Sequence, residues 1–129
     1  MDSFWEGAEI ISQYTRADAI NDGQLIDVTE TAKEAGFLYP VAVTQAVWAD
    51  YVVPDERARK YGQDEVGRLW DILWMLKYAI KRSEGGFIVS YDLHMIMKEK
   101  KLRRIKLKSI CHPGDTGEPV ITIMTPDED

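Results

Sequence analysis

The segment over residues 64–82 most constrains the fold of this chain, because it is the longest stretch with a helical repeat of apolar residues. The repeating residues lie three and four positions apart, as on one helix face: Val66, Leu69, Trp70, Leu73, Leu76 and Ile80. Further apolar residues widen that face, and a helix with so broad an apolar surface packs in the centre of a fold. We therefore predict one central helix over about 64–82, in which Trp70 and Leu73 are almost fully buried.

The residues that follow change from a helical to an alternating period. Alternation of apolar and polar residues over about 87–97 and 102–111 predicts half-buried strands, and the apolar run over about 119–125 predicts a strand covered on both faces. Sequential strands with short links favour an antiparallel meander. Helices followed by strands indicate an α+β fold. With 129 residues, we expect a single α+β domain over 1–129, with short N-terminal helices and the central helix packed on a C-terminal antiparallel β-meander.

The N-terminal part carries clear signals for a short helix. Thr15 and Asp18 have the spacing of a capping box, and Gly23 suits the left-handed residue that ends a helix. Extended segments flank this helix, at Ile10-Ile11 before it and at residues 25–28 after it.

Two more helices are predicted from similar signals. Thr31 and Glu34 fit a second capping box, with Gly36 closing the helix. Pro40 suits the first turn of a third helix, because its missing N–H has no partner there in any case. The buried face of this third helix is expected to hold Val41, Val43, Thr44, Val47, Trp48 and Tyr51. The polar segment over 54–62 predicts a loop or a short surface helix.

Composition excludes several classes of protein. Hydrophobic residues make up 45% of the chain and charged residues 29%, as in ordinary globular proteins rather than disordered ones. No apolar run approaches the ~18–20 residues of a membrane helix, and the first residues carry Asp2 and Glu6 instead of the basic flank of a signal peptide. One cysteine, Cys111, excludes an internal disulfide and a multi-cysteine zinc site. We expect a cytoplasmic protein with no membrane contact.

Charge is distributed unevenly along the chain. The net charge is −6, yet residues 81–112 hold 9 Lys/Arg against 3 Asp/Glu, and residues 113–129 hold 5 acidic residues and no basic one. This pattern fits either an electrostatic binding face or a solvated strand that pairs with an acidic tail. Arg104, Lys106 and Lys108 share one strand face without the interleaved aromatic residues of single-strand binders. We predict a solvated face and no nucleic-acid partner, and leave the role of the basic segment 98–108 open.

No residue cluster gives a specific catalytic or metal site. Cys111 and His112 are adjacent on a strand and point to opposite faces, so they do not form a nucleophile–base pair. His94 and His112 could meet across a hairpin, but two ligands without a third make a weak metal site. Asp115 and Glu118 lie in a turn before a strand and form at most a weak cation site. We therefore expect no metal and no cofactor.

One segment has a resemblance that implies chemistry. In Tyr14-Thr15-Arg16-Ala17 and the residues up to Leu25, a strand end, a hydroxyl residue, a short helix and Gly-x-Leu follow in order. This resembles in outline the opening of ADP-ribosyltransferase-type folds. The resemblance implies that Tyr14 and Thr15 hold the nicotinamide ribose of NAD, which makes Tyr14, Thr15 and Arg16 the candidate site. The later catalytic Gln or Glu is not recognisable, and a capped helix explains the same residues without chemistry.

A second resemblance covers nearly the whole chain. It rests on blocks in a fixed order, among them Tyr14-Thr15-Arg16-Ala17, Tyr39-Pro40-Val41-Ala42-Val43-Thr44, Gly67-Arg68-Leu69-Trp70-Asp71 and Gly114-Asp115 to Met124. These resemble a family of uncharacterised bacterial proteins often carried on plasmids, integrative elements and phages. The resemblance implies a mobile-element setting and no mechanism.

Two classes of function remain after these exclusions. One is an accessory or anti-defence factor that binds a host or element-encoded protein, because an acidic surface can occupy a basic groove. The other is a small ADP-ribosyltransferase-like enzyme that binds NAD at Tyr14 and Thr15. We favour the binding protein over the enzyme, and the sequence leaves the partner and the oligomeric state open.

Overall fold

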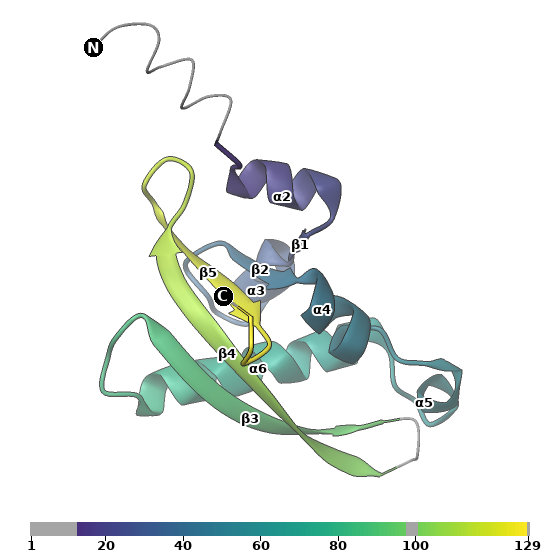
Figure 1. The fold of residues 1–129 in the computed structure, drawn as a ribbon. Helices are drawn as coiled ribbons and strands as arrows, with labels where there is room; N and C mark the ends of the chain where they lie inside the picture. Colours follow the sequence, from purple (N-terminus) through teal and green to yellow (C-terminus); the bar gives the residue numbers. More distant parts are fainter. Residues whose placement is uncertain (1–12, 98–100, 129) are drawn as a thin grey trace, which may run out of the picture.

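A computed structural model of the protein describes residues 13–97 and 101–128. Its centre is a five-stranded sheet with the strand order β1-β2-β5-β4-β3 (Figure 1). The strands are β1 (Leu25–Asp27), β2 (Val41–Thr44), β3 (Ile88–Ile96), β4 (Leu102–Pro113) and β5 (Pro119–Met124). The helices are α2 (Arg16–Asp22), α3 (Thr29–Glu34), α4 (Gln45–Val47), the π-helix η1 (Trp48–Val52), α5 (Glu56–Lys60) and α6 (Glu65–Arg82). The fold is α+β, as the sequence predicts.

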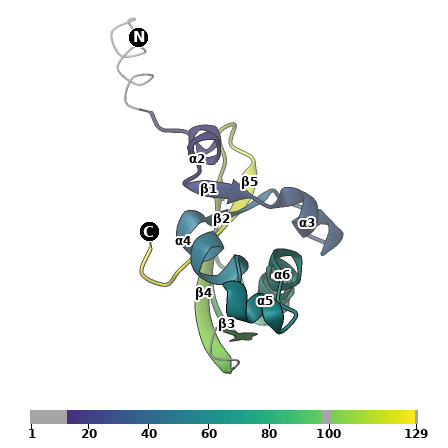
Figure 2. The ribbon, with the colours of Figure 1, turned by 90° about the vertical axis from the view of Figure 1, so that its right-hand side faces the viewer.

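Helix α6 covers one face of the sheet, which we call the inner face (Figure 2). Its buried residues Ile72, Leu73 and Leu76 pack in one core with inward side chains of the strands, including Leu107 and Ile123. The Tyr91 hydroxyl donates a hydrogen bond of 3.1 Å to the carbonyl of Ile72. The predicted central helix is therefore confirmed, with the sheet beneath it.

The C-terminal meander is also confirmed. Strands β3, β4 and β5 pair antiparallel in sequential order. All five residues over 120–124 are buried, as the apolar run on both faces of this segment predicts. Helix α2 lies against the outer face of β5, where its Arg16 reaches Thr122. The strand before Thr15 predicted at Ile10-Ile11 lies outside the described residues.

The third predicted helix is wrong at its start. Val41–Thr44 forms strand β2, which pairs antiparallel with β1 and parallel with β5, so the sheet is mixed. Val41, Ala42 and Val43 are fully buried, and a short run that is apolar on both faces suits a central strand better than an amphipathic helix. Helix α4 begins only after Thr44, whose hydroxyl accepts from the N–H of Val47.

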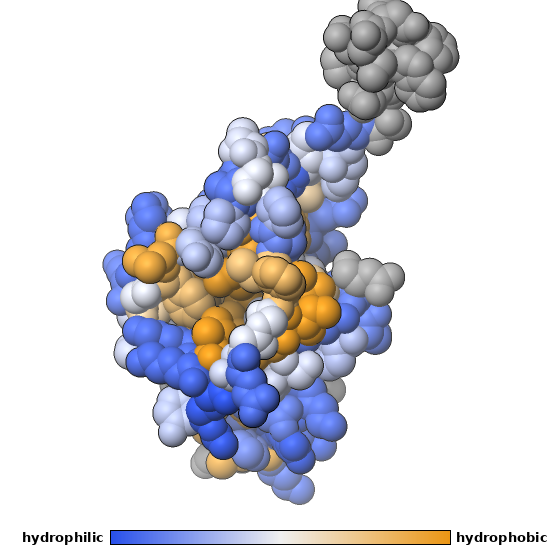
Figure 3. Space-filling view, turned by 90° about the vertical axis from the view of Figure 1, so that its left-hand side faces the viewer, coloured by the Kyte–Doolittle hydropathy of each residue, from blue (hydrophilic) through white to orange (hydrophobic). Residues whose placement is uncertain are grey.

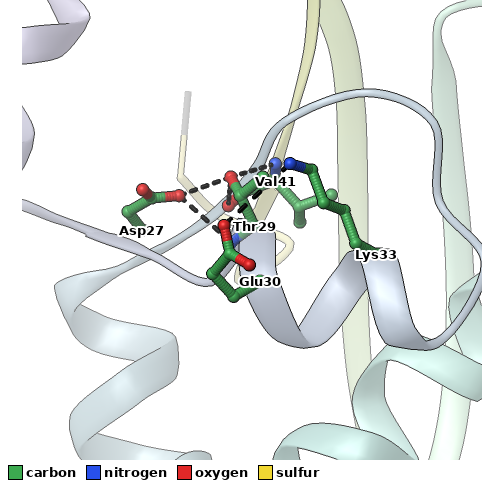
Figure 4. A network of polar contacts seen from close by, with 5 residues as sticks. All are labelled: Asp27, Thr29, Glu30, Lys33 and Val41. Atoms are coloured by element: carbon green, nitrogen blue, oxygen red, sulfur yellow. Dashed lines mark hydrogen bonds and ion pairs between the residues drawn. The ribbon is translucent and has the colours of Figure 1, made fainter.

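The second predicted capping box is also wrong, because α3 begins earlier, at Thr29. The Thr29 hydroxyl donates to Asp27 Oδ1 at 2.5 Å and accepts from the N–H of Val41 at 3.1 Å. These bonds join the end of β1 to the start of β2, beside an ion pair of Glu30 with Lys33 at 4.0 Å (Figure 4). Thr29 thus fixes the corner of the sheet instead of Thr31 capping a helix.

The buried stripe of α6 differs in detail from the predicted one. Leu73 is fully buried as predicted, but Trp70 is only half-buried and Val66 is 64% exposed. Arg68 takes the central place, with 2% exposure, and donates to the carbonyl oxygens of Ile96 at 2.5 Å and Tyr51 at 3.3 Å. The helix therefore turns Arg68 inward, because its guanidinium can satisfy carbonyls that an apolar side chain would leave unpaired.

Candidate functional site

The three residues of the predicted site, Tyr14, Thr15 and Arg16, lie at the start of α2 and line a pocket on the outer face of the sheet. The pocket has a volume of about 670 Å³. We call it the α2 pocket; its other lining residues include Leu25, Thr44, Ile110, His112, Thr122 and Met124. The structure thus brings the predicted residues together with His112, which lies almost a hundred positions later in the sequence.

The polar groups of Tyr14 and Thr15 are used within α2 itself. The Thr15 hydroxyl accepts from the N–H of Asp18 at 3.0 Å, and the Asp18 carboxylate accepts from the N–H of Thr15 at 3.2 Å. This is the predicted capping box, and Gly23 ends the helix with a φ of 87°. The Tyr14 hydroxyl donates to the carboxylate of Asp22, and this bond raises the pKa of Tyr14 to about 12.

Arg16 joins α2 to the centre of the sheet. Its guanidinium donates to Thr122 Oγ1 at 2.6 Å and to the carbonyl oxygen of Ile121 at 2.9 Å. Partial burial lowers the pKa of Arg16, against the opposing charges of Asp27 and other carboxylates. His112 Nε2 lies 2.9 Å from Thr122 Oγ1, so Thr122 stands between a cation and an imidazole. This arrangement positions α2 and gives the pocket a polar wall.

Asp115 has a structural partner that the sequence did not indicate. Its carboxylate, at the tip of the β4–β5 hairpin, accepts from the backbone N–H groups of Arg16 and Ala17. These two bonds lower the pKa of Asp115. Glu118, the other residue of the predicted weak cation site, accepts instead from Thr116. Within residues 13–97 and 101–128, no three His, Cys, Asp or Glu residues are grouped to hold a metal ion.

The register of the strands tests the two predictions about cysteine and histidine pairs, because it determines which side chains lie on the same face of the sheet. Cys111 is opposite Ile121 on β5, while His112 bonds to Thr122 on the outer face, so the two side chains diverge as predicted. The suggested meeting of His94 with His112 is wrong. His94 is opposite Arg104 near one end of β4, and His112 is opposite Val120 near the other.

The basic strand face has acidic neighbours in the same chain. Arg104 forms an ion pair with Asp92 across the strands, and the charge of Lys108 contributes to a lowered pKa of Asp127, whose main cause is a bond from Thr125. Glu128 accepts from the hydroxyl of Thr44 at 2.8 Å, which fixes the residues after β5. The described part of the acidic tail therefore folds back beside the basic strand, as predicted, while Asp129 lies outside the described residues.

A second candidate site is an apolar surface at the C-terminal end of α6. Among its residues, Leu38 is 91% exposed and Phe87 76% exposed. We call this surface the end patch and define it by Leu38, Tyr39, Ile80 and Phe87. Hydrophobic residues gather in the middle of this end of the molecule, with hydrophilic residues above and below them (Figure 3).

Backbone and side-chain contacts link the segments of the end patch. Lys77 Nζ donates to the carbonyl of Ala35 at 2.9 Å, which places the last turns of α6 beside the segment that carries Leu38. The carbonyl of Phe87 accepts from Cys111 N at 2.8 Å, and Cys111 is paired with Ile121. The patch therefore lies at the C-terminal end of α6, beside the row of strand residues that includes Cys111 and Ile121.

The whole chain, residues 1–129, matches a protein family described as a family of unknown function (DUF6573). The chain belongs to this family. No curated protein and no solved structure matches it. In the part of the DUF6573 protein that the structure describes, no helix has the length and apolar character needed to cross a membrane.

Sequence reasoning missed the long-range partners of the α2 pocket and the whole end patch. Asp115 follows a turn glycine, and such a pattern does not indicate a helix start 99 residues away. The alternation over about 87–97 predicts a strand that includes Phe87, but β3 begins one residue later, at Ile88. One sequence signal could have indicated the end patch. Two large apolar residues, Leu38 and Tyr39, precede Pro40 in a segment that has neither a helical nor a strand period.

Proposed function

We propose that this DUF6573 protein is a binding factor that docks a partner protein on the end patch. The observation that carries the proposal is the exposure of two large apolar side chains at this end of the molecule, Leu38 at 91% and Phe87 at 76%. Isolated exposed apolar residues are common, but contiguous ones mark interaction sites. Large apolar side chains in the centre of such a surface contribute most of the binding free energy.

The support beneath the patch favours a preformed site. Tyr39 leads into the fully buried Val41 of β2, and Ile80 is part of the last turn of the central helix. Side chains that project from fixed elements lose little conformational entropy when a partner binds. The exposed charged residues near Ile80 and Phe87 in the sequence, Lys81 and Glu84, would then select the partner by charge.

The class of partner follows from the resemblance to proteins of plasmids, integrative elements and phages. We infer an accessory or anti-defence role, in which the protein occupies a host or element-encoded protein. The net charge of −6 is compatible with a basic partner. The basic strand β4 with Arg104 and Lys106 is not part of the end patch, and Arg104 pairs with Asp92 of the same chain. Its positive charge is therefore compatible with a basic partner at the end patch.

The alternative is an NAD-binding enzyme of ADP-ribosyltransferase type that uses the α2 pocket. A pocket of about 670 Å³ with Arg16 and His112 in its wall is large enough for part of a dinucleotide. However, the hydroxyls of Tyr14 and Thr15 already bond to Asp22 and to the N–H of Asp18. A ligand would have to compete with both bonds, so the binding function is the better proposal.

Affinity capture with matched variants tests the proposal. The wild type, Phe87→Ser and Leu38→Ser are compared with Val66→Ser, which removes another exposed apolar residue, 64% accessible, at the opposite end of α6. We expect a partner that the wild type and Val66→Ser retain and that both patch variants lose. Equal capture by all four proteins, with unchanged melting temperatures, would contradict a role for the end patch.

A further inference from the structure

The strand β3 has one free edge. It pairs with β4 alone and ends the sheet, and no other strand in the described part of the chain adjoins it. The bond from Cys111 N to Phe87 O sets the alternation of the ladder. The residues whose backbone N–H and C=O groups point away from β4 are therefore Ile88, Ser90, Asp92, His94 and Ile96, of which the carbonyl of Ile96 already accepts from Arg68. A regular edge of nine residues without proline is a template for pairing with another strand.

A groove runs along this edge, between β3 and one flank of α6. One end of the groove is lined by Met75, Tyr78 and Arg82 of α6 together with residues 88–92, and has a volume of about 620 Å³. The other end is lined by Asp71 and Met75 together with residues 92–94. Asp71 thus lies beside His94, and Arg82 lies beside Ile88, at opposite ends of the groove.

The charges at the two ends of the groove are opposite in sign. Among the described residues, neither Asp71 nor Arg82 has an ion-pair partner; Arg82 lies over the ring of Tyr78 at 5.7 Å. Partial burial without a cation nearby raises the pKa of Asp71. A partly buried carboxylate without a partner is unfavourable, and a guanidinium brought to it would relieve that cost.

We propose that a second copy of this chain docks on the groove, so that two β3 strands pair antiparallel across a two-fold axis. Such an axis near Tyr91 exchanges the Ile88 end of one strand with the His94 end of the other. It therefore brings Asp71 of each copy to Arg82 of the other and Met75 to Tyr78. Both ion pairs form at once, because a two-fold interface uses the same surface twice.

The register around Tyr91 also avoids repulsion along the strands. It places Ser90 opposite Asp92 of the second copy and Ile88 opposite His94. A register centred on Asp92 would instead put two carboxylates directly opposite each other, which is destabilising. None of the four residues that define the end patch lines the groove, so the dimer goes beyond the proposed function.

Variants in which the charges of Asp71 and Arg82 are reversed test the proposed dimer, and the measured quantity is the molar mass in solution. Sedimentation equilibrium at about 10–200 µM should give the wild type twice the 14.8 kDa of one chain. Asp71→Arg and Arg82→Asp should each weaken dimerisation about tenfold or more, because each puts like charges opposite each other. The double variant D71R/R82D restores both pairs and should recover the wild-type dimer. Mixed with wild type, it should form no mixed dimers.

Two controls separate the interface from the fold. Lys81→Asp makes the same charge change as Arg82→Asp on the next residue, which does not line the groove, and should leave the dimer intact. Ser90→Pro removes an N–H that points away from β4, so it should abolish the dimer with little change in melting temperature. A monomeric wild type at 200 µM, or single charge reversals that have no effect or are not rescued by the double variant, would overturn the proposal.

Discussion

Asp115 and Arg16 are joined by a bond that holds the first turn of α2 to the tip of the β4–β5 hairpin. The carboxylate of Asp115 accepts from the N–H of Arg16 at 2.8 Å, and also from the N–H of Ala17 at 3.0 Å. The first N–H groups of a helix have no partner within it, so a carboxylate there both satisfies them and complements the helix dipole. The hairpin therefore acts as a cap supplied from a distant part of the sequence.

Asp115→Ala should loosen α2. With the N–H groups of Arg16 and Ala17 unpaired, we expect the amides of α2 to exchange hydrogen roughly threefold to tenfold faster, since lost caps have effects of that order. The measurement is native-state hydrogen exchange by NMR, with Asp50→Ala, an exposed carboxylate on η1, as the control. Unchanged exchange in α2 would mean that Arg16 alone holds the helix.

The same cap should depend on pH. Since the pKa of Asp115 is lowered in the folded protein, the stabilisation is present above the unfolded pKa of about 4 and is lost as the pH falls through the folded value. We expect the exchange difference between wild type and Asp115→Ala to be constant near neutral pH and to vanish in acid. A difference that persists at about pH 2 would contradict an ionised cap.

Leu73→Ala should be strongly destabilising. The side chain is fully buried between α6 and the sheet, so its truncation loses transfer free energy and leaves a cavity, at a cost of about 2–5 kcal/mol. Urea unfolding gives this free energy, and Val66→Ala at an exposed position of the same helix should cost less than about 0.5 kcal/mol. Similar values for the two variants would show that the inner face is not the core.

Arg68→Met should reduce stability although it replaces a buried charge by an apolar chain of similar length. The carbonyls of Ile96 and Tyr51 accept from this guanidinium, and each carbonyl left without a partner costs roughly 1–3 kcal/mol. Arg68→Lys should retain only part of the stability that Arg68→Met loses, since an ammonium group cannot reach both carbonyls. The free energy of unfolding of each variant is measured by urea unfolding. An Arg68→Met variant as stable as the wild type would contradict the prediction, because it would show that water satisfies the two carbonyls.

NAD should not stabilise the protein. The polar groups of Tyr14 and Thr15 are bonded within α2, so we expect about 1 mM NAD to leave the melting temperature unchanged. A rise of roughly 2 °C or more that disappears in Thr15→Ala would instead favour the enzyme.

Local signals in the sequence predicted what local contacts determine. Thr15, Asp18 and Gly23 fix α2 through bonds within it, and the alternation over 87–111 fixes two paired strands. The strand Val41–Thr44 was missed because its pairing with β5 spans eighty residues, and a four-residue apolar run has no period of its own. Trp70 is less buried than predicted because Arg68 points into the core instead, and it does so to bond carbonyls of η1 and β3 that the local sequence does not reveal.

For the candidate site, sequence and structure agree on less. The sequence located Tyr14, Thr15 and Arg16, but His112 and Thr122 reach the same pocket only through the register of β4 with β5. The end patch depends on where α6 stops relative to the sheet, and helix periodicity does not specify that.

The nucleic-acid prediction follows from the ion pair of Arg104 with Asp92 and the closeness of Asp127 to Lys108. At about 50 mM salt, where phosphate contacts are strongest, labelled DNA and RNA should show no sub-micromolar binding. Binding that is lost when Arg104, Lys106 and Lys108 become Ala would make nucleic acid the leading partner.

The most direct test of the binding function is the hydrogen-exchange footprint of the captured partner on this protein. With the partner present, we predict slower exchange for the amides around Leu38 and over 84–87, and unchanged exchange in α2 and α5. Protection confined to the α2 pocket, or to the basic strand with Lys106, would contradict the assignment of the end patch as the docking surface.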